Sequence, residues 1–463
     1  MQVAPASSSH PPTSERRQIA RIAVPVSLEM IFALLLGFID QIIVGRLGAL
    51  AIASVGFANS VTFIGILALG SLGAGAAILT ARLHGAENRD SISRVTSATL
   101  VIGVIIAAVL AVPLLLLAPT FLQLVGAPRE VAQSGTPYFQ IVVGALPLVV
   151  IGGIASAVLR SLGHARTPMV VTIIGVLVNT VLGYALVFGL GAVPALGLAG
   201  AAWATLVAQL IKAVVLLWQL YGPRDLVDWR LPERLGAWKT TTRDLFHFTL
   251  PLAFTEVAWS VGTFLYAFLF GRLSVNALAS SQIVNTLEGI FIVGSFGLGA
   301  ATTALVGQAV GSGDATLAAR RVRLLLNTGA VTGVAFGLLF AASALALGVF
   351  YPKVADEVLT FAVWGILINA AFQWVKVQNM IRGMGVLPSG GDTRGVIVGD
   401  VIGAFLVGLP LAYLLAFPLG FGVLGLFWAR IFEEIAKLAV FALRTKRISW
   451  GKVVEGQKEV VTS

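Results

Sequence analysis

The chain alternates between long apolar stretches and short polar segments. Each apolar stretch reaches or approaches the roughly 20 residues that an α-helix needs to cross a bilayer. The stretches lie at 18–44, 51–80, 95–118, 133–159, 168–190, 196–220, 246–270, 277–308, 325–349, 356–380, 396–416 and 421–442. The pattern predicts an all-α membrane protein with twelve transmembrane helices. Because twelve is even, both termini are expected on the same side of the membrane.

Lysine and arginine are distributed unevenly over this predicted topology. Most of them lie in the two termini and in the loops that follow even-numbered spans, whereas the opposite loops carry Arg46, Arg129, Arg272 and Lys353. The positive-inside rule then places both termini in the cytoplasm, in a bacterial-type inner (plasma) membrane. The net charge of +10 is explained by topology and by contact with anionic lipid, so nucleic acid is not an expected partner.

The two halves of the chain repeat one another. Pro25 and the Gly-Arg-Leu of 45–47 recur at an offset of 226, and the Gly-x-x-Gly-x-x-Trp of 197–203 recurs at an offset of 225. Six spans per half make the repeats parallel, as in secondary transporters built from two lobes. The repeat predicts two six-helix bundles related by pseudo-two-fold symmetry.

The expected domains follow from this repeat. We expect an N-lobe over 18–220 and a C-lobe over 246–443, joined by a cytoplasmic inter-lobe loop over 221–245. Polar segments at 1–17 and 444–463 are expected to be cytoplasmic tails, the first of them disordered.

Composition removes several classes of function. Hydrophobic residues make up 57% of the chain and charged residues 11%, with a mean hydropathy of +0.94, whereas soluble domains carry about 25% charged residues. The chain has no cysteine, which excludes disulfides. Its four histidines lie in the tail or near span ends, so we expect no metal site. The sequence contains no P-loop, HExxH or nucleophile elbow, so we expect neither an enzyme, nor direct use of ATP, nor a cofactor.

The first span carries two carboxylates, Glu29 and Asp40. A charge at bilayer depth costs several kcal/mol, so such residues are functional candidates. The two are eleven residues apart, which puts them near one helix face and about 16 Å apart along the axis. Pro25 lies one turn before Glu29 and is a candidate hinge, because proline kinks a helix. These features indicate a mobile, cation-handling helix; the alternative is two acids that snorkel or pair with a neighbouring helix.

The repeat makes differences between the halves informative. Asp40 corresponds to Tyr266, whereas Glu29 has a near counterpart in Glu256. Tyr266 could line a cavity for organic cations through cation–π contacts, or anchor its helix at the membrane interface. Glu29 and Glu256 could also bind substrate or cation. Glu288 and Asp400 occur only in the second half, where they could bind substrate or cation or form interhelical hydrogen bonds.

Two further sets of polar residues lie inside spans. Asn179, in the middle of the fifth span, is a candidate ligand. Four charged residues of the last span are expected mainly to pair with one another at i,i+3 and i,i+4 spacing. They are Arg430, Glu433, Glu434 and Lys437.

Several segments together resemble one family. They are PVSLEM at 25–30, GFIDQIIVGRLGALAIASVGFANS at 37–60, GAPREVAQSGTPYF at 126–139, the segment from Asn179 to GLAGAAWAT, and GGDTR at 390–394. Over about 15–455 the chain resembles the multidrug and toxic compound extrusion (MATE) transporters. The resemblance implies twelve helices in two lobes and efflux of drugs or toxic organic compounds against Na⁺ or H⁺.

The resemblance also implies roles for individual residues. Asp40 matches the first-helix carboxylate that the family uses in cation coupling. Asn179 matches the fifth-helix asparagine of the DNA-damage-inducible (DinF-like) branch, which often has a carboxylate four residues later. In this chain that position is Gly183. Glu256 is similar to a seventh-helix glutamate of other branches.

We therefore expect a cation-coupled antiporter that works as a monomer, by rocking of the two lobes. H⁺ is favoured over Na⁺ as the coupling ion because Asp40 beside Gly183 offers few oxygen ligands. The substrate is expected to be a small cationic or amphipathic organic compound. The main alternative is a flippase for lipid-linked precursors, which more often has fourteen spans and a cationic cavity. An intramembrane enzyme would need a cluster of histidine, serine and aspartate or of metal ligands at membrane depth, and the sequence has none. A channel would need a selectivity filter, and none is evident.

Overall fold

The computed structural model describes residues 12–190, 194–222, 226–232, 235–351 and 354–462. Within these residues nine helices are long and apolar enough to cross a membrane, and eleven spans result when each of two bent helix pairs is counted as one. The helix α18 (Gly422–Arg447) is 26 residues long and carries four charged side chains in its middle; at about 1.5 Å per residue it is also long enough to span. The prediction of an all-α, twelve-helix membrane protein is confirmed.

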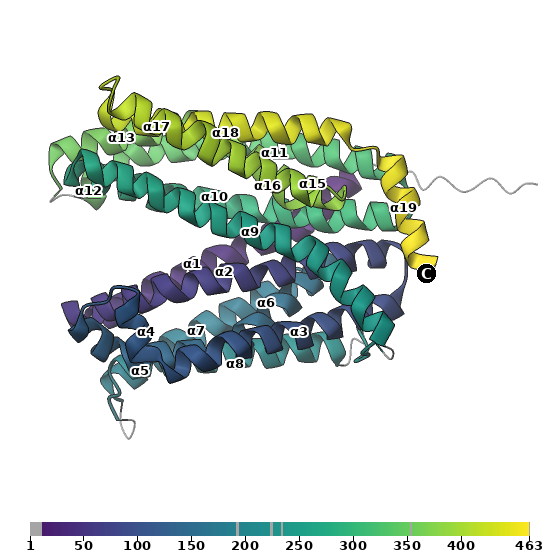
Figure 1. The fold of residues 1–463 in the computed structure, drawn as a ribbon, viewed down its shortest axis with the longest axis horizontal. Coiled ribbons are helices and arrows are strands. Elements are labelled where there is room, and N and C mark those ends of the chain that lie inside the picture. Colours follow the sequence, from purple (N-terminus) through teal and green to yellow (C-terminus); the bar gives the residue numbers. More distant parts are fainter. Residues whose placement is uncertain (1–11, 191–193, 223–225, 233–234, 352–353, 463) are drawn as a thin grey trace, which may run out of the picture.

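Eight helices build the N-lobe, drawn in purple and blue in Figure 1. They are α1 (Pro12–Gly45), α2 (Ala49–Gly85), α3 (Arg89–Leu116), α4 (Ala118–Leu124), α5 (Arg129–Gly144), α6 (Leu146–Ser161), α7 (Arg166–Phe188) and α8 (Leu198–Tyr221). The chain bends by 41° between α5 and α6, which together form one span. Pro147 is the second residue of α6, and its ring cannot continue an uninterrupted helix from α5.

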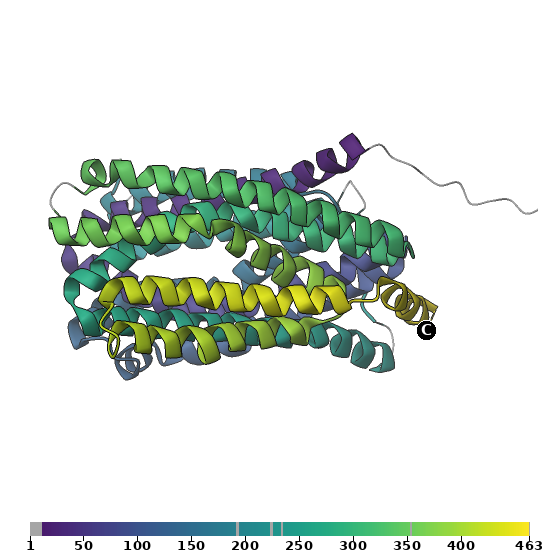
Figure 2. The ribbon, with the colours of Figure 1, turned by 90° about the horizontal axis from the view of Figure 1, so that it is seen from above.

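The C-lobe follows the same plan, in teal, green and yellow (Figures 1 and 2). Its first helices are α9 (Leu235–Leu273), α10 (Val275–Gly311), α11 (Ala315–Ser343) and the short α12 (Leu347–Phe350). A bent span follows, made of α13 (Asp356–Ala371) and, after a break of 51°, α14 (Gln373–Ile381) with α15 (Leu387–Ser389). The last helices are α16 (Thr393–Val401), α17 (Leu409–Ala416), α18 and α19 (Trp450–Thr462).

Each lobe has its own apolar core, while other apolar side chains face outward. Fully buried Phe139, Leu159 and Leu216 belong to the N-lobe core, and Phe340 and Ile366 to the C-lobe core. Outward-facing residues include Val109, Leu116, Val331, Leu338 and Leu406. An exposed apolar belt of this kind is satisfied by lipid, which supports the membrane assignment.

Three expected boundaries differ in detail from the structure. The helix α1 begins at Pro12, inside the segment expected to be a tail, and it continues through Pro25 as one helix. Residues 1–11 lie outside the described residues. Most of the expected tail at 444–463 is helical, in the end of α18 and in α19. The expected inter-lobe loop at 221–245 falls between α8 and the early part of α9, and its assignment as the lobe boundary stays a prediction.

The lobes touch at the end of the molecule where α19 lies and diverge towards the other end (Figure 1). At the touching end α2 crosses α10. A Cβ atom on Gly85 would lie 1.9 Å from the Gln308 carbonyl oxygen, and one on Gly311 would lie 1.7 Å from the Arg82 carbonyl oxygen. Only glycine permits so close an approach of two backbones. These two contacts are equivalent under the 226-residue repeat, as expected around a two-fold axis.

Side chains next to this crossing reach into the opposite lobe. Arg82 donates to the carbonyl oxygen of Ser389, 2.9 Å away, and Gln308 donates to that of Ser161, 2.8 Å away. Arg82 and Gln308 are again repeat equivalents. We call this set of contacts, together with Gly85 and Gly311, the cross-lobe contact.

We predict that Gly311→Ala separates the lobes at this end. The added methyl group would overlap a backbone carbonyl, and overpacking of this kind costs about 1–3 kcal/mol. Because the chain has no cysteine, Ser161→Cys, at a position only 2% exposed, provides a reporter. Its labelling by a water-soluble thiol reagent should rise about tenfold in the Gly311→Ala background.

The matched control is Gly289→Ala on the same helix, where a Cβ atom meets nothing within 4 Å. It should leave labelling unchanged. Equal labelling in both variants would show that the glycine contact does not hold the lobes together.

Candidate cation and substrate sites

Asp40 lies on α1 opposite α7 and α8. The Asn179 amide on α7 lies 2.8 Å from Asp40 Oδ1 at one end and 3.1 Å from Thr205 Oγ1 on α8 at the other. Asn179 is completely buried. The two expected coupling residues are thus brought together, and the structure adds Thr205 to them.

This row of side chains has two complete hydrogen-bonding arrangements. When Asp40 is charged, the Asn179 nitrogen donates to the carboxylate and its oxygen accepts from the Thr205 hydroxyl. When Asp40 is protonated, its hydroxyl can donate to the Asn179 oxygen. The Asn179 nitrogen then donates to Thr205 Oγ1, which donates to the Ala201 carbonyl 3.1 Å away. A flip of the amide therefore leaves no polar group unpaired in either protonation state of Asp40.

Gly183 and Tyr138 are two further neighbours of this row. A Cβ atom on Gly183 would meet Asn179 Oδ1, Ile43 and Ala204 at 3.7 Å, so the position is open for a small side chain but supplies none. Tyr138 on α5 interacts electrostatically with Asp40, but its hydroxyl donates to Asn59 Oδ1 at 3.1 Å. Hard cations such as Na⁺ need several oxygen ligands, and a proton needs only one.

Glu29 does not join this group. Its carboxylate accepts from Arg160 of α6 at 2.9 Å and is almost fully buried. The expectation that Glu29 could pair with a neighbouring helix agrees with this contact. Pro25 lies one turn before Glu29 on α1, and its role as a hinge stays a prediction.

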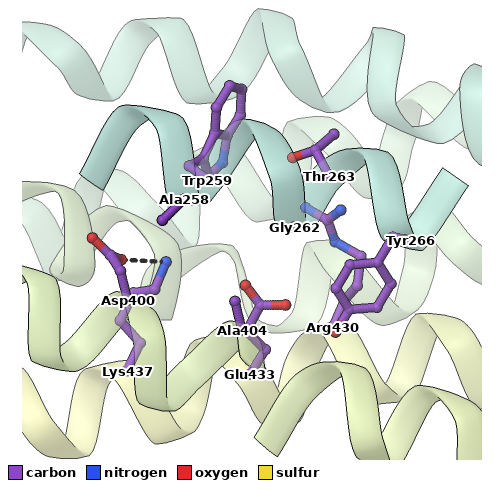
Figure 3. A pocket seen from close by; sticks show the side chains of 10 residues that line it. All are labelled: Ala258, Trp259, Gly262, Thr263, Tyr266, Asp400, Ala404, Arg430, Glu433 and Lys437. Atoms are coloured by element: carbon purple, nitrogen blue, oxygen red, sulfur yellow. Dashed lines mark ion pairs between the residues drawn. The ribbon is translucent and has the colours of Figure 1, made fainter. Parts of the chain in front are cut away.

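The C-lobe holds a larger group of buried charges. Glu288 of α10 pairs with Lys376 of α14, which also donates to Asn369 at 2.6 Å. Asp400 of α16 pairs with Lys437 of α18 at 2.8 Å, as Figure 3 shows. Glu288 and Asp400 are therefore members of ion pairs between helices.

The last span only partly follows the expected pairing. Lys437 lies 3.8 Å from Glu434 at i,i+3 spacing, but its shorter contact is with Asp400. Arg430 lies over the ring of Tyr266, 5.0 Å from its centroid. Glu256 of α9 lies near Asp400 of α16. In the described part of the chain Glu256 forms no ion pair.

Lys376 and Thr205 belong to these groups but were not among the sequence candidates. Lys376 interrupts an apolar span, and the rarity of a lysine at bilayer depth was a usable signal. Thr205 carried no such signal, because threonine is common in membrane helices and only the packing of α7 on α8 brings it to Asn179.

Two lobes of six spans around buried ionisable groups define a multi-pass membrane transporter, not an enzyme. The sequence matches the model of the MatE family at residues 25–185 and 251–414, one match in each lobe. The chain belongs to the MATE family.

Similar proteins span the whole chain. The multidrug resistance protein NorM of Burkholderia vietnamiensis is 27% identical over 442 residues, which cover 93% of this chain and 94% of the relative. A probable multidrug resistance protein NorM of Pseudomonas aeruginosa is 28% identical and covers 91% and 87% of the two chains. These relatives do not test whether the chain belongs to the DinF-like branch, and that assignment stays a prediction.

Solved structures share the fold. A MATE protein in a bent conformation superposes with a TM-score of 0.84 at 19% identity, covering 97% of both chains. An outward-facing multidrug resistance MATE transporter gives a TM-score of 0.83 at 20% identity, covering 94% of this chain and 96% of the other.

We predict that Lys376→Met destabilises the protein, whereas Lys376→Met combined with Glu288→Met restores most of the stability. Removing one partner of a buried ion pair costs about 3–5 kcal/mol, and replacing both by apolar groups is often neutral. Thermal unfolding in detergent measures both effects. If the double variant is stable and transports normally, the pair is structural; if it is stable but inactive, the pair has a functional role.

Proposed function

We propose that this chain exports drug-like organic compounds in exchange for protons, with Asp40 as the proton-binding group. The observation that carries the proposal is the row Asp40–Asn179–Thr205, which has a complete hydrogen-bonding arrangement for both the charged and the protonated acid. Proteins of similar sequence are named for multidrug resistance, which favours drug efflux over the flippase alternative.

The proposed cycle uses the geometry of α1. Proton uptake by Asp40 removes a charge from α1 and reverses the direction of its hydrogen bond with Asn179. The helix then no longer needs a wet environment around Asp40, and the proline at position 25 lets it bend and pack differently against α7. This repacking displaces the organic substrate.

Release of the proton on the other side requires the lobes to rock. The cross-lobe contact closes the end of the molecule that the basic loops assign to the cytoplasm, and the lobes diverge at the other end (Figure 1). We infer that this arrangement is the outward-facing state in an inner membrane. Separation of the α2–α10 crossing would give the inward-facing state.

We predict that Asp40→Asn abolishes proton-driven efflux while the protein still folds. Asparagine resembles the protonated acid in shape and charge, so position 40 can no longer alternate between a charged and a neutral side chain. The measurement is efflux of an organic cation dye from proteoliposomes under an imposed pH gradient, with thermal unfolding as the control for folding. Normal export by Asp40→Asn, or wild-type export that follows Na⁺ and ignores pH, would contradict the proposal.

We predict that Gly183→Asp makes efflux sensitive to Na⁺. The added carboxylate would lie beside Asn179, in a position where a Cβ atom makes only ordinary contacts, and it would supply the oxygen ligands that the native site lacks. Efflux driven by a Na⁺ gradient should appear in this variant and be absent from the wild type. Gly183→Ala, which adds bulk without oxygen, serves as the control and should stay insensitive to Na⁺.

A further inference from the structure

The C-terminal segment after α18 lies at the end of the molecule where the lobes touch. Helix α18 ends at Arg447, the backbone is extended at Ile448, and α19 then runs in a new direction across this end (Figures 1 and 2). Helix α19 packs on α10 and α11, so it is part of the C-lobe. Its position next to the cross-lobe contact suggests a role in that contact.

One N-lobe residue, Arg82, touches two separate parts of the C-lobe. Its backbone carbonyl lies against Gly311 at the end of α10. Its guanidinium donates to the carbonyl oxygens of Pro388 and Ser389 in α15, 3.3 and 2.9 Å away. Both contacts can form together only while α10 and α15, which are far apart in the sequence, keep a fixed position relative to each other.

Helix α15 has little internal support. It contains three residues and follows a π-helical turn at 382–386. A helix this short makes too few hydrogen bonds to hold its own conformation. The positions of the carbonyl groups that Arg82 binds must therefore be fixed by packing from outside.

Ile448 provides such packing on α15. A Cβ atom on Gly390, which directly follows α15, would lie 2.7 Å from Ile448 Cδ1 and 3.1 Å from its Cγ2. Ile448 also packs against Leu387 of α15, which is fully buried. The end of α18 is tied to the same part of the chain, because Arg444 donates to both carboxylate oxygens of Asp392 at 3.1 Å.

The start of α19 packs on the other part. Ala309 and Val310 belong to the last turn of α10, directly before Gly311, and both are fully buried. The apolar side chains that pack against them include Trp450 and Val453 of α19. The C-terminal segment therefore contacts both parts of the C-lobe that the N-lobe touches.

We propose that Ile448, Trp450 and Val453 are positioning residues that hold α15 and the end of α10 in place, so that the cross-lobe contact can close. The proposal rests on the proposed cycle of alternating access, in which this contact opens and closes. The C-terminal segment then sets the balance between the two states, because it supports a contact that only the outward-facing state contains.

The test measures opening of the cross-lobe contact with two thiol reporters in this cysteine-free chain. Ser161→Cys lies at the contact and Ser280→Cys lies near the opposite end of α10, at positions that are 2% and 0% exposed. Ile448→Ala combined with Trp450→Ala should raise labelling of the first reporter by a water-soluble thiol reagent about tenfold, equivalent to about 1.4 kcal/mol. Labelling of the second reporter should not change.

Trp364→Ala is the matched control, because Trp364 lies on α13, outside the C-terminal segment, and is about half exposed. It should leave the labelling of both reporters unchanged. Trp450→Phe keeps an apolar ring at the position, so it should keep labelling of the Ser161→Cys reporter low.

Transport kinetics in inside-out vesicles give a second measurement. The Ile448→Ala/Trp450→Ala variant should lower the KM of the exported compound by up to about tenfold, because a larger fraction of the protein is inward-facing. Its kcat should not rise. A lower kcat at an unchanged KM would indicate general destabilisation and would count against the proposal.

Unchanged labelling of the Ser161→Cys reporter in the folded double variant, or an equal rise in both reporters, would overturn the proposal. If the double variant does not fold, the smaller changes Ile448→Val and Trp450→Leu should still raise labelling of the first reporter alone, and no rise would be equally decisive. Labelling does not require export. A protein that shows the expected labelling but exports nothing would refute the efflux function and leave the positioning role standing.

Discussion

The cost of a charge at bilayer depth is the constraint on which the rest of this structure depends. A buried ionised group must be paired, hydrogen-bonded or neutralised, because no water is available to solvate it. The buried acids meet this constraint in two ways. Asp40 faces an amide and a hydroxyl that can reverse their hydrogen bonds. Glu29 in the same lobe faces an arginine, and Glu288 and Asp400 in the C-lobe face lysines. A neutral partner lets an acid change its protonation state; a permanent cation keeps it ionised.

The pseudo-two-fold repeat allows this division of labour. A duplicated bundle starts with two equivalent sites, and substitution at equivalent positions, such as Asp40 and Tyr266, is sufficient to give them different chemistry. The repeat also places the contact between lobes on the symmetry axis, where Gly85 and Gly311 make equivalent approaches to the opposite backbone. A contact shared equally by two similar bodies can open by rotation without distorting either core.

Much of the fold could be read from the sequence because its signals are local or strictly periodic. A run of about 20 apolar residues needs no tertiary information to be recognised as a span, and the recurring offsets of 225 and 226 reveal the duplication directly. The bends within spans were harder to predict. The bend between α5 and α6, and the one within the tenth span, lie inside apolar stretches where hydropathy does not change. The helical character of residues 12–17 and of 450–462 was also missed, since polar segments outside the bilayer carry no span signal.

The sequence by itself determined the class of protein, the repeat and the candidates Asp40 and Asn179, because buried acids and amides are rare enough to stand out against an apolar background. Only the tertiary structure decided which of the buried groups meet. It joined Asn179 and Thr205 to Asp40, assigned Arg160 to Glu29 and Lys376 to Glu288, and directed Arg430 onto Tyr266 instead of onto its own helix neighbours. The physical reason is that a side chain's partner depends on how helices distant in sequence pack and rotate against each other, and no spacing along one helix encodes that relation.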